Sequence, residues 1–422
     1  MTAAMRHVLV FAKTPYEKTP YDRWLAGTGV VPVIVTAREY AEGYAHLPHV
    51  HAFDAYDTSQ LVEKAALRLA REFAVDAVFA RAEADVVRAA RLRERLGLPG
   101  QHTASALAFR DKVVMKDHLA GAAVEVPAYE RVESAHTVLD FVERHGYPVV
   151  VKPVSESGSL GAAVIRDEAE LDAYLADPWR GPSEVEAFVP GRMYHVDGLV
   201  TGGDVVFVHP FRYLNDCLSF RRNEWVANVP LSPRDPAYDR LVKAALSVLE
   251  ALPTPRQTAF HAEFWITPDD RLVFCEIAGR TGGGMISAMV RHAFGLDLDR
   301  EWLYAECGLP TAAGDPVSSG ALAALPAYRP AGALCIPPQS GVLERLPATG
   351  PGSGQPACVR ETVLTGAVGE RFHGGVKSGL FLAGYVVGGE TEDEVAAHIG
   401  QVADWFAENS RWRGAECSGG AE

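Results

Sequence analysis

The sequence contains no pair of cysteines at the spacing of a zinc finger, a redox motif or a disulfide scaffold. Six cysteines are spread over 422 residues, and none belongs to a Cys-x-x-Cys pair. Small secreted domains depend on disulfides because they cannot build a large core, whereas a chain of this length can. We therefore expect free thiols in a reducing compartment. The cysteines stand at positions 217, 275, 307, 335, 358 and 417.

Long apolar runs are also missing. No stretch approaches the ~18 apolar residues needed to cross a bilayer, and the apolar run near the N-terminus, HVLVFA, is too short for the core of a signal peptide. Basic residues are in the minority, 40 against 54 acidic ones, so the formal net charge is -14. This charge opposes binding to nucleic acid and to anionic membranes. We expect neither partner, and a cytoplasmic location.

The first hundred residues alternate between strand-like and helix-like patterns. Apolar strands are expected at 6–13, 30–37 and 76–80, with amphipathic helices at 60–73 and 84–98. Strands that are separated by helices build a parallel sheet covered on both faces. The pattern predicts a doubly wound α/β domain over residues 1–105.

The pattern then changes to a mixed α+β order. One helix is expected from Thr103 to residue 122 and another behind Ser134, followed by a strand, a Gly/Ser loop, a strand and a third helix. Mainly antiparallel strands come next, and a strand and a long helix lie near the C-terminus. We predict a lid subdomain at 106–190, a large subdomain at 191–325 and a small C-terminal α+β subdomain at 326–422.

The segment HAEFWITPDDRLVFCE, residues 261–276, predicts a β-hairpin around a Pro-Asp-Asp turn. A reversal in the middle of that turn places Glu263 opposite Glu276. The inner pairs of the same register are Ile266 with Val273 and Phe264 with Cys275. Facing carboxylates lie about 4.5–5.5 Å apart at Cβ and repel each other. A divalent cation such as Mg²⁺, which accepts carboxylate and phosphate oxygens, would remove this repulsion.

Side-chain alternation places further residues on the face that carries the two glutamates. These are Trp265, Phe274, Ala278 and Arg280. Two carboxylates and a guanidinium on one face suit a site for a metal ion and a phosphate. For an isolated pair of acids the commoner arrangement is different: a slipped register turns one glutamate to solvent or into a surface ion pair with Arg280. The hairpin alone leaves both interpretations open.

Lys152 lies at the end of the apolar run VVVKP, directly before the small-residue loop SESGSLG, residues 155–161. An ammonium group beside a flexible loop with exposed backbone N–H groups suits a phosphate. Taken alone, the loop is more often an ordinary turn between strands. It matches neither GxxxxGK[ST] nor a dinucleotide-binding loop, because it joins two strands and opens no helix.

In this order and spacing, the segments resemble the ATP-grasp superfamily, and within it the carboxylate–amine ligases similar to L-amino acid ligases. The resemblance covers roughly residues 100–300. It depends on FRDK with Lys112, VVVKP, SESGSLG, VEAFVPG, FHAEFW and CEIAGRTGGG. It implies a nucleotide held between two α+β subdomains, and a carboxylate activated as an acyl phosphate that an amine then attacks, with release of ADP and phosphate.

The resemblance also implies a role for each matching residue. The phosphate-contacting residues are Lys112, Lys152, Ser157, Gly158, Ser159 and Gly161; the adenine hinge is Glu186, Ala187 and Val189; the Mg²⁺ ligands are Glu263 and Glu276. Arg280 and Lys152 are the implied catalytic residues. The implied cofactors are ATP and one or two Mg²⁺ ions, for which Mn²⁺ can substitute.

Two positions depart from the family pattern. Ala278 stands where the family commonly has an asparagine, which puts a second metal ion in doubt. Met193 stands where a ribose-binding glutamate is frequent. An inactive nucleotide-binding protein is therefore one alternative to the ligase, and a carboxylase or purine-pathway enzyme that activates bicarbonate or formate is another.

The substrates are expected to be a small carboxylate and an amine, of the amino acid or peptide type. Arg221 and Arg222 are candidates for reading a substrate carboxylate, although loop arginines are mostly solvated. Gly282 and Gly283 offer backbone N–H groups to the same end. His195 and His261 lie in strand-like runs and are expected to be core histidines. A homodimer is the commonest assembly for such enzymes.

Overall fold

The computed structural model describes residues 5–178, 181–312, 328–350 and 352–414. Cys417 and the subdomain boundary predicted at residue 325 lie outside these ranges. None of the helices in the described part of the chain is both long and apolar enough to cross a membrane.

The N-terminal sheet is parallel, with strand order β3-β2-β1-β4, which confirms the predicted α/β architecture. Strand β1 is apolar on both faces because helices cover both: Val8 and Val10 belong to one core cluster, Leu9 and Phe11 to another. The elements are β1 Arg6–Ala12, α1 Tyr21–Leu25, β2 Val30–Ala37, a 3₁₀ turn Arg38–Tyr40, α2 Ala41–Tyr44, β3 Val50–Phe53, α3 Gln60–Glu72, β4 Ala77–Ala80, a 3₁₀ turn Glu83–Asp85 and α4 Val86–Leu96.

The lid contains an antiparallel sheet of order β5-β8-β6-β7, with α7 and α8 packed against it. Phe141 of α7 and the β6 residues Val149 and Val151 are fully buried in its core. Asp167 caps α8 by accepting a hydrogen bond from the backbone N of Glu170. The elements are β5 Tyr129–Val132, α7 Ala135–His145, β6 Val149–Pro153, β7 Ala163–Ile165, α8 Glu168–Ala176 and β8 Ser183–Ala187.

The single helix predicted from Thr103 is wrong. The chain forms two helices, α5 Thr103–Ala108 and α6 Lys112–His118. The side chain of Asp111 accepts hydrogen bonds from the backbone N of Val113 and Val114, so it ends the first helix and starts the second. This break also allows the backbone N of Lys112 to donate to Val154 O, which ties α6 to the end of β6.

The large sheet has eight strands in the order β13-β12-β9-β10-β11-β14-β18-β16. The C-terminal strands β14, β18 and β16 therefore continue the sheet that carries the hairpin. The sequence pattern predicts them in a small C-terminal subdomain and does not predict this continuity. The strands are β9 Arg192–Thr201, β10 Asp204–Tyr213, β11 Val226–Pro230, β12 Thr258–Ile266, β13 Leu272–Ala278, β14 Ala331–Ile336, β16 Val359–Leu364 and β18 Ala383–Gly388.

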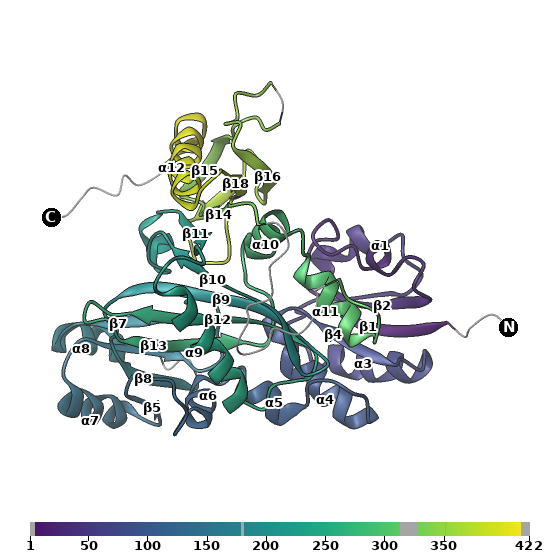
Figure 1. Ribbon diagram of the computed structural model, residues 1–422, viewed down its shortest axis with the longest axis horizontal. Helices are drawn as coiled ribbons and strands as arrows, with labels where there is room; N and C mark the ends of the chain where they lie inside the picture. Colours follow the sequence, from purple (N-terminus) through teal and green to yellow (C-terminus); the bar gives the residue numbers. More distant parts are fainter. Residues whose placement is uncertain (1–4, 179–180, 313–327, 351, 415–422) are drawn as a thin grey trace.

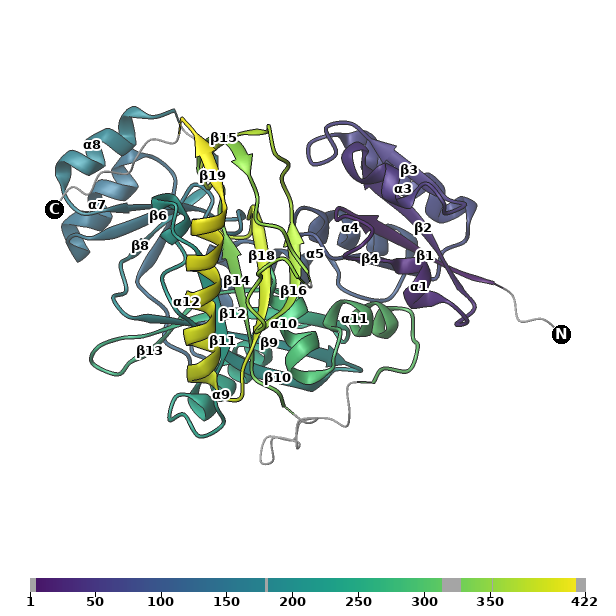
Figure 2. The ribbon, with the colours of Figure 1, turned by 90° about the horizontal axis from the view of Figure 1, so that it is seen from above.

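Helices and a second, three-stranded sheet complete this part. Helix α12 packs on the C-terminal strands through Val395, Ile399 and Val402. Figure 2 shows this helix lying alongside β14 and β18. The sheet has order β17-β15-β19. The elements are a 3₁₀ turn Ser219–Arg222, α9 Tyr238–Ala251, α10 Ile286–Phe294, α11 Leu298–Glu306, β15 Ser340–Arg345, β17 Arg371–His373, α12 Glu392–Asn409 and β19 Arg411–Arg413.

Three parts of the molecule surround the middle of the large sheet. In Figure 1 the N-terminal sheet lies at the right, the lid with α7 and α8 at the lower left, and α12 with the C-terminal strands at the top. Helix α11 joins the large sheet to the N-terminal part, where Trp302 packs edge-on against Phe79 with ring centroids 4.8 Å apart. The hairpin β12–β13 is thus positioned to meet residues from the other parts.

Candidate active site

Glu263 pairs with Glu276 across β12 and β13, as predicted. The two inner pairs predicted from the turn are wrong, because β13 contains a bulge at Cys275. Phe264 pairs with Phe274, and Ile266 pairs with Leu272. Bulges insert one extra residue and reverse the side-chain alternation beyond it.

The bulge also corrects the predicted faces of the hairpin. Phe274 does not share the glutamate face, because its ring packs against Phe264 with centroids 5.6 Å apart in the core behind the sheet. This packing accounts for the bulge. The extra residue lets both aromatic rings point into the core while Glu276 still pairs with Glu263.

Each of the two glutamates has partners of its own. Tyr213 donates to Glu263 Oε1 at 2.9 Å, and His261 Nε2 lies 3.4 Å from the same oxygen. Lys112 Nζ lies 3.1 Å from Glu276 Oε2. Burial alone would raise the pKa of Glu263, but the contacts from His261 and Tyr213 lower it below its usual value. Glu263 is therefore ionised at neutral pH, and both side chains offer oxygens to a hard cation.

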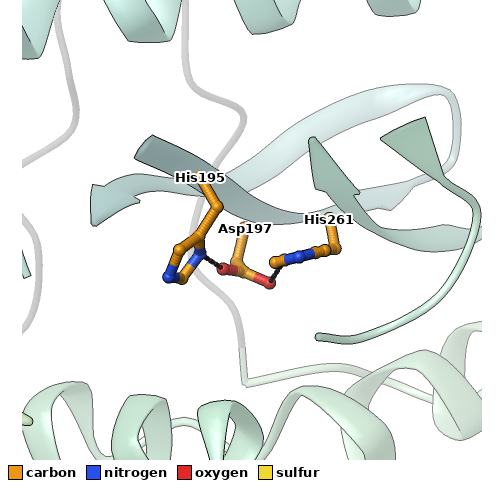
Figure 3. A group of neighbouring side chains, drawn as sticks. All are labelled: His195, Asp197 and His261. Carbon is orange, nitrogen blue, oxygen red and sulfur yellow. Dashed lines mark hydrogen bonds and ion pairs between the residues drawn. The ribbon is translucent and has the colours of Figure 1, made fainter. Parts of the chain in front are cut away.

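His195, Asp197 and His261 form a buried group beside Glu263. Figure 3 shows the Asp197 carboxylate between the two imidazoles, which it meets at 2.6 Å from His195 Nδ1 and 3.0 Å from His261 Nδ1. Burial opposes a charge on His261, but Asp197 raises its pKa to about 10, whereas burial lowers the pKa of His195. The core histidines expected from sequence are thus one imidazolium and one neutral ring, and together with Asp197 they orient Glu263.

Lys152 lies inside a buried cluster of four charges. It contacts Glu186 at 2.6 Å and Glu184 at 3.6 Å, while Lys116 contacts Glu184 at 2.8 Å and Glu186 at 2.7 Å. Burial would lower the pKa of Lys152, but Glu186 raises it well above its usual value. Lys116 was not predicted, although it follows Lys112 by one turn of α6 and so shares its face.

The Gly/Ser loop joins β6 to β7 and takes left-handed conformations at Gly158, Ser159 and Gly161 (φ +63°, +58° and +73°). Lys112 Nζ donates to Glu156 O at 2.8 Å, and Arg221 donates to Ser159 O at 3.2 Å. The loop is therefore held by cations from two other elements.

The adenine hinge expected at Glu186, Ala187 and Val189 lies at the end of β8. The Ala187 N–H is already used, because it donates to Ala128 O at 2.9 Å, and the Glu186 side chain is turned into the lysine cluster. A role for these residues in binding adenine remains a prediction.

Arg280 points across to the N-terminal part of the chain. Its Nε forms an ion pair with Glu83, which also accepts from Arg110 at 2.9 Å. Burial would raise the pKa of Glu83, but Arg280 and Arg110 lower it to about 2. Neither Glu83 nor Arg110 was predicted. The signal available was the position of Glu83 just beyond the carboxyl end of a parallel strand, where ligand sites of α/β sheets form.

Part of this site surrounds a small cavity of about 10 Å³, lined among others by Lys112, Ser157, Glu276, Arg280 and Glu83. The cavity thus brings together the predicted phosphate loop, one of the two predicted metal ligands and the arginine, and the other metal ligand, Glu263, is paired with Glu276. The cavity is far smaller than the ~300–1,000 Å³ of most ligand pockets.

The predicted substrate residues are distributed unevenly. Arg221 reaches the Gly/Ser loop, whereas Arg222 is exposed between Asp216 and Glu224, at 2.9 and 2.8 Å. A side chain at Gly282 would collide with Ile286, and Gly283 faces open space. The substrate contact proposed for Arg222 has no geometric support, while Gly283 can approach a ligand.

Comparison with known proteins accords with this geometry. Residues 111–188 match the family model of the carbamoyl-phosphate synthase L chain, ATP binding domain. The crystal structure of an L-amino acid ligase from Bacillus licheniformis superposes with a TM-score of 0.76, 18% identity, and coverage of 96% of this chain and 98% of the other. The chain has the ATP-grasp fold.

Two further proteins are similar to this chain, one in sequence and one in structure. An L-arginine-specific L-amino acid ligase of Bacillus subtilis is 26% identical over 277 residues, 63% of this chain and 66% of the relative, so the match spans just under two thirds of that protein. The biotin carboxylase domain of the Hydrogenobacter thermophilus 2-oxoglutarate carboxylase, solved with MgADP and bicarbonate, has a TM-score of 0.70 and 15% identity, with coverage of 97% and 91%.

Proposed function

We propose that this protein is an ATP-dependent carboxylate–amine ligase that joins a small amino acid-like carboxylate to an amine. The observation that supports this most is the convergence of Glu276, Lys112 and Arg280 on one cavity beside the Gly/Ser loop, with Glu263 paired to Glu276 on the adjacent strand. Phosphoryl transfer needs positioning and charge neutralisation, and these groups supply both.

The residues present fit Mg²⁺. Two glutamate side chains from adjacent strands offer the hard oxygen donors that this ion takes, together with the phosphates of a nucleotide. Glu263 and Glu276 would hold the ion, and it would neutralise phosphate charge when bound. With Ala278 in place of a third oxygen donor, we propose one firmly held ion, for which Mn²⁺ can substitute since it prefers the same ligands.

The chain's own groups then divide the work. Lys112 begins α6, which is hydrogen-bonded to the end of β6, and Lys152 lies on β6. Both lysines would contact phosphates, and Lys152 would leave Glu186 to do so. Arg280 would leave Glu83 to meet the transferring phosphoryl group. The oxygen of the acid forms a bond to the γ-phosphorus as the bond to ADP breaks. The amine nitrogen then attacks the acyl carbon, phosphate leaves, and the nitrogen loses a proton to solvent.

The test is release of ADP and phosphate with Mg²⁺, ATP and a panel of amino acids, singly and in pairs, with product masses measured. We expect ADP formation that requires both a carboxylate and an amine, and a product whose mass equals their sum less one water. ADP formation that depends on bicarbonate would instead establish a carboxylase. Nucleotide binding without turnover in any mixture would establish an inactive binding protein.

We also propose that the protein assembles as a homodimer. The biotin carboxylase domain named above is described as a dimer, and cyclic dimers are the commonest soluble assemblies. Light scattering coupled to size exclusion measures this directly, and a monomer mass at micromolar concentration would refute it.

A further inference from the structure

A second glycine-rich segment, residues 374–380 with the sequence GGVKSGL, lies against the Gly/Ser loop 155–161. Lys377 Nζ donates to Ser157 Oγ at 3.0 Å across 220 positions of sequence, and the backbone N of Ser378 donates to Gly158 O at 3.1 Å. The C-terminal part of the chain thus supplies a second wall to the expected phosphate site.

The fit between the two segments requires a glycine. A Cβ at Gly158 would lie 2.7 Å from Cγ and 2.8 Å from Cε of Lys377, so the lysine stem runs directly over this glycine. The segment continues toward the other expected ligand contacts, because a Cβ at Gly379 would be 3.9 Å from the backbone N of Gly284. The segment 374–380 therefore meets the Gly/Ser loop through Lys377 and approaches Gly284 through Gly379.

Lys377 differs from the other cations of the site in its partners. Lys112, Lys152 and Arg280 each have a carboxylate partner. Within the described ranges, the half-buried ammonium of Lys377 has no carboxylate within 4.0 Å, and its hydrogen bond goes to a neutral hydroxyl. Burial and the nearby charge of Arg280 lower the pKa of Lys377. An anionic ligand would relieve this arrangement.

We propose that Lys377 is a further catalytic residue, which contacts the phosphoryl group while it passes from ATP to the substrate carboxylate. This inference rests on the proposed ligase function. The bond between the γ-phosphorus and the β–γ bridging oxygen breaks as the bond to the carboxylate oxygen forms. Lys377 gives up no proton in this step: its ammonium neutralises charge on the phosphoryl oxygens and on the acyl phosphate that results.

The experiment compares Lys377→Met, which keeps the stem over Gly158 but removes the charge, with Lys377→Arg, which keeps the charge. Lys64→Met, on the exposed face of α3, is the matched control. We expect Lys377→Met to lower kcat for ADP formation by ~10²-fold, with less effect on KM for ATP, and Lys377→Arg to recover most of the loss. A kcat for Lys377→Met equal to that of the control would overturn the inference.

Ser157→Ala separates catalysis from bracing of the loop. This change removes the hydroxyl that Lys377 contacts but leaves the ammonium in place. If the charge acts on the phosphoryl group, Ser157→Ala costs clearly less kcat than Lys377→Met. If Lys377 only holds the loop, the two variants lose the same amount, and the catalytic role is refuted.

Calorimetric binding of ATP and ADP, each with Mg²⁺, keeps the inference testable even if no substrate pair yields turnover. In that case the proposed ligase function fails by itself. Lys377 would still be expected to favour ATP over ADP, and Lys377→Met to remove that preference while leaving ADP affinity unchanged. An unchanged preference in Lys377→Met would refute the phosphoryl contact.

Discussion

Two pairs of glutamates lie on strands of this chain, Glu184 with Glu186 on β8 and Glu263 with Glu276 on the hairpin. The side chains of the first pair are 0% and 3% exposed and share two lysines, so their charge is balanced within the protein. Those of the second pair are 14% and 28% exposed. Lys112 contacts Glu276, the His261 imidazolium and the Tyr213 hydroxyl contact Glu263, and Glu276 lines the cavity.

The comparison shows that two neighbouring glutamates on a sheet do not by themselves indicate a metal site. A buried pair that is matched by cations is part of the folded core, and its loss leaves an uncompensated charge. A partly exposed pair at a cavity is available to an external cation. The two pairs should therefore respond in opposite ways to substitution, one in stability and one in activity.

The largest effect on stability is expected from Lys116→Met. It leaves Glu184 and Glu186 with only Lys152, and breaking a buried ion pair costs about 3–5 kcal/mol in the free energy of unfolding. Urea unfolding measures the change against the control Lys64→Met. A loss below about 1 kcal/mol would mean that the lid tolerates an unbalanced carboxylate, and the contrast between the two pairs would disappear.

Glu276→Gln should lower turnover by ~10²–10³-fold, because it removes a charged oxygen from the proposed metal site. The free energy of unfolding should change by less than about 1 kcal/mol, since the side chain is partly exposed and already adjoins solvent. The rate of ADP release and a urea unfolding curve test both halves. Wild-type turnover in this variant would remove the metal assignment.

A pH titration of stability should also separate the pairs. Burial raises the pKa of Glu186, but Lys116 and Lys152 lower it to about 2 from 4.5, so its contribution is present above pH about 4.5 and is lost as the pH falls toward 2. Glu186→Gln should therefore remove up to about 3 kcal/mol of the stability that the wild type loses over this range. The free energies of unfolding of both proteins from pH 5 to pH 2 provide the check, and parallel curves would contradict it.

The smallest effect is expected from Arg222→Ala. The side chains in its ion pairs are more than half exposed. The free energy of unfolding, and the activation free energy that corresponds to kcat/KM, should therefore stay within about 0.5 kcal/mol of the wild type. Arg221→Ala is the informative neighbour, because Arg221 holds the Gly/Ser loop and its loss should lower turnover more. A tenfold fall in kcat/KM for Arg222→Ala would reinstate it as a substrate contact.

The sequence predicted those parts of the site that depend on local signals. The pairing of Glu263 with Glu276 follows from the turn residues, and the Gly/Ser loop from its composition. The bulge at Cys275 could not be predicted, because it depends on how two phenylalanine rings share the core behind the hairpin.

Contacts between segments that lie far apart in the sequence could not be predicted either. Glu83 meets Arg280 across 197 positions and Lys377 meets Ser157 across 220, and neither follows from any local pattern. The C-terminal strands were expected as a separate small unit. They belong to the large sheet because β14 pairs with β11, and this pairing depends on tertiary packing.

The continuity of the eight-stranded sheet has a practical consequence for anyone dividing this protein into pieces. A fragment that stops before β14 would expose the hydrogen-bonding edge of β11 over the residues Val226 to Asn228. Open edges of this kind recruit other chains. Expression of the part of the chain before β14 alone should therefore yield aggregates, and a shortened version of the protein calls for cuts elsewhere.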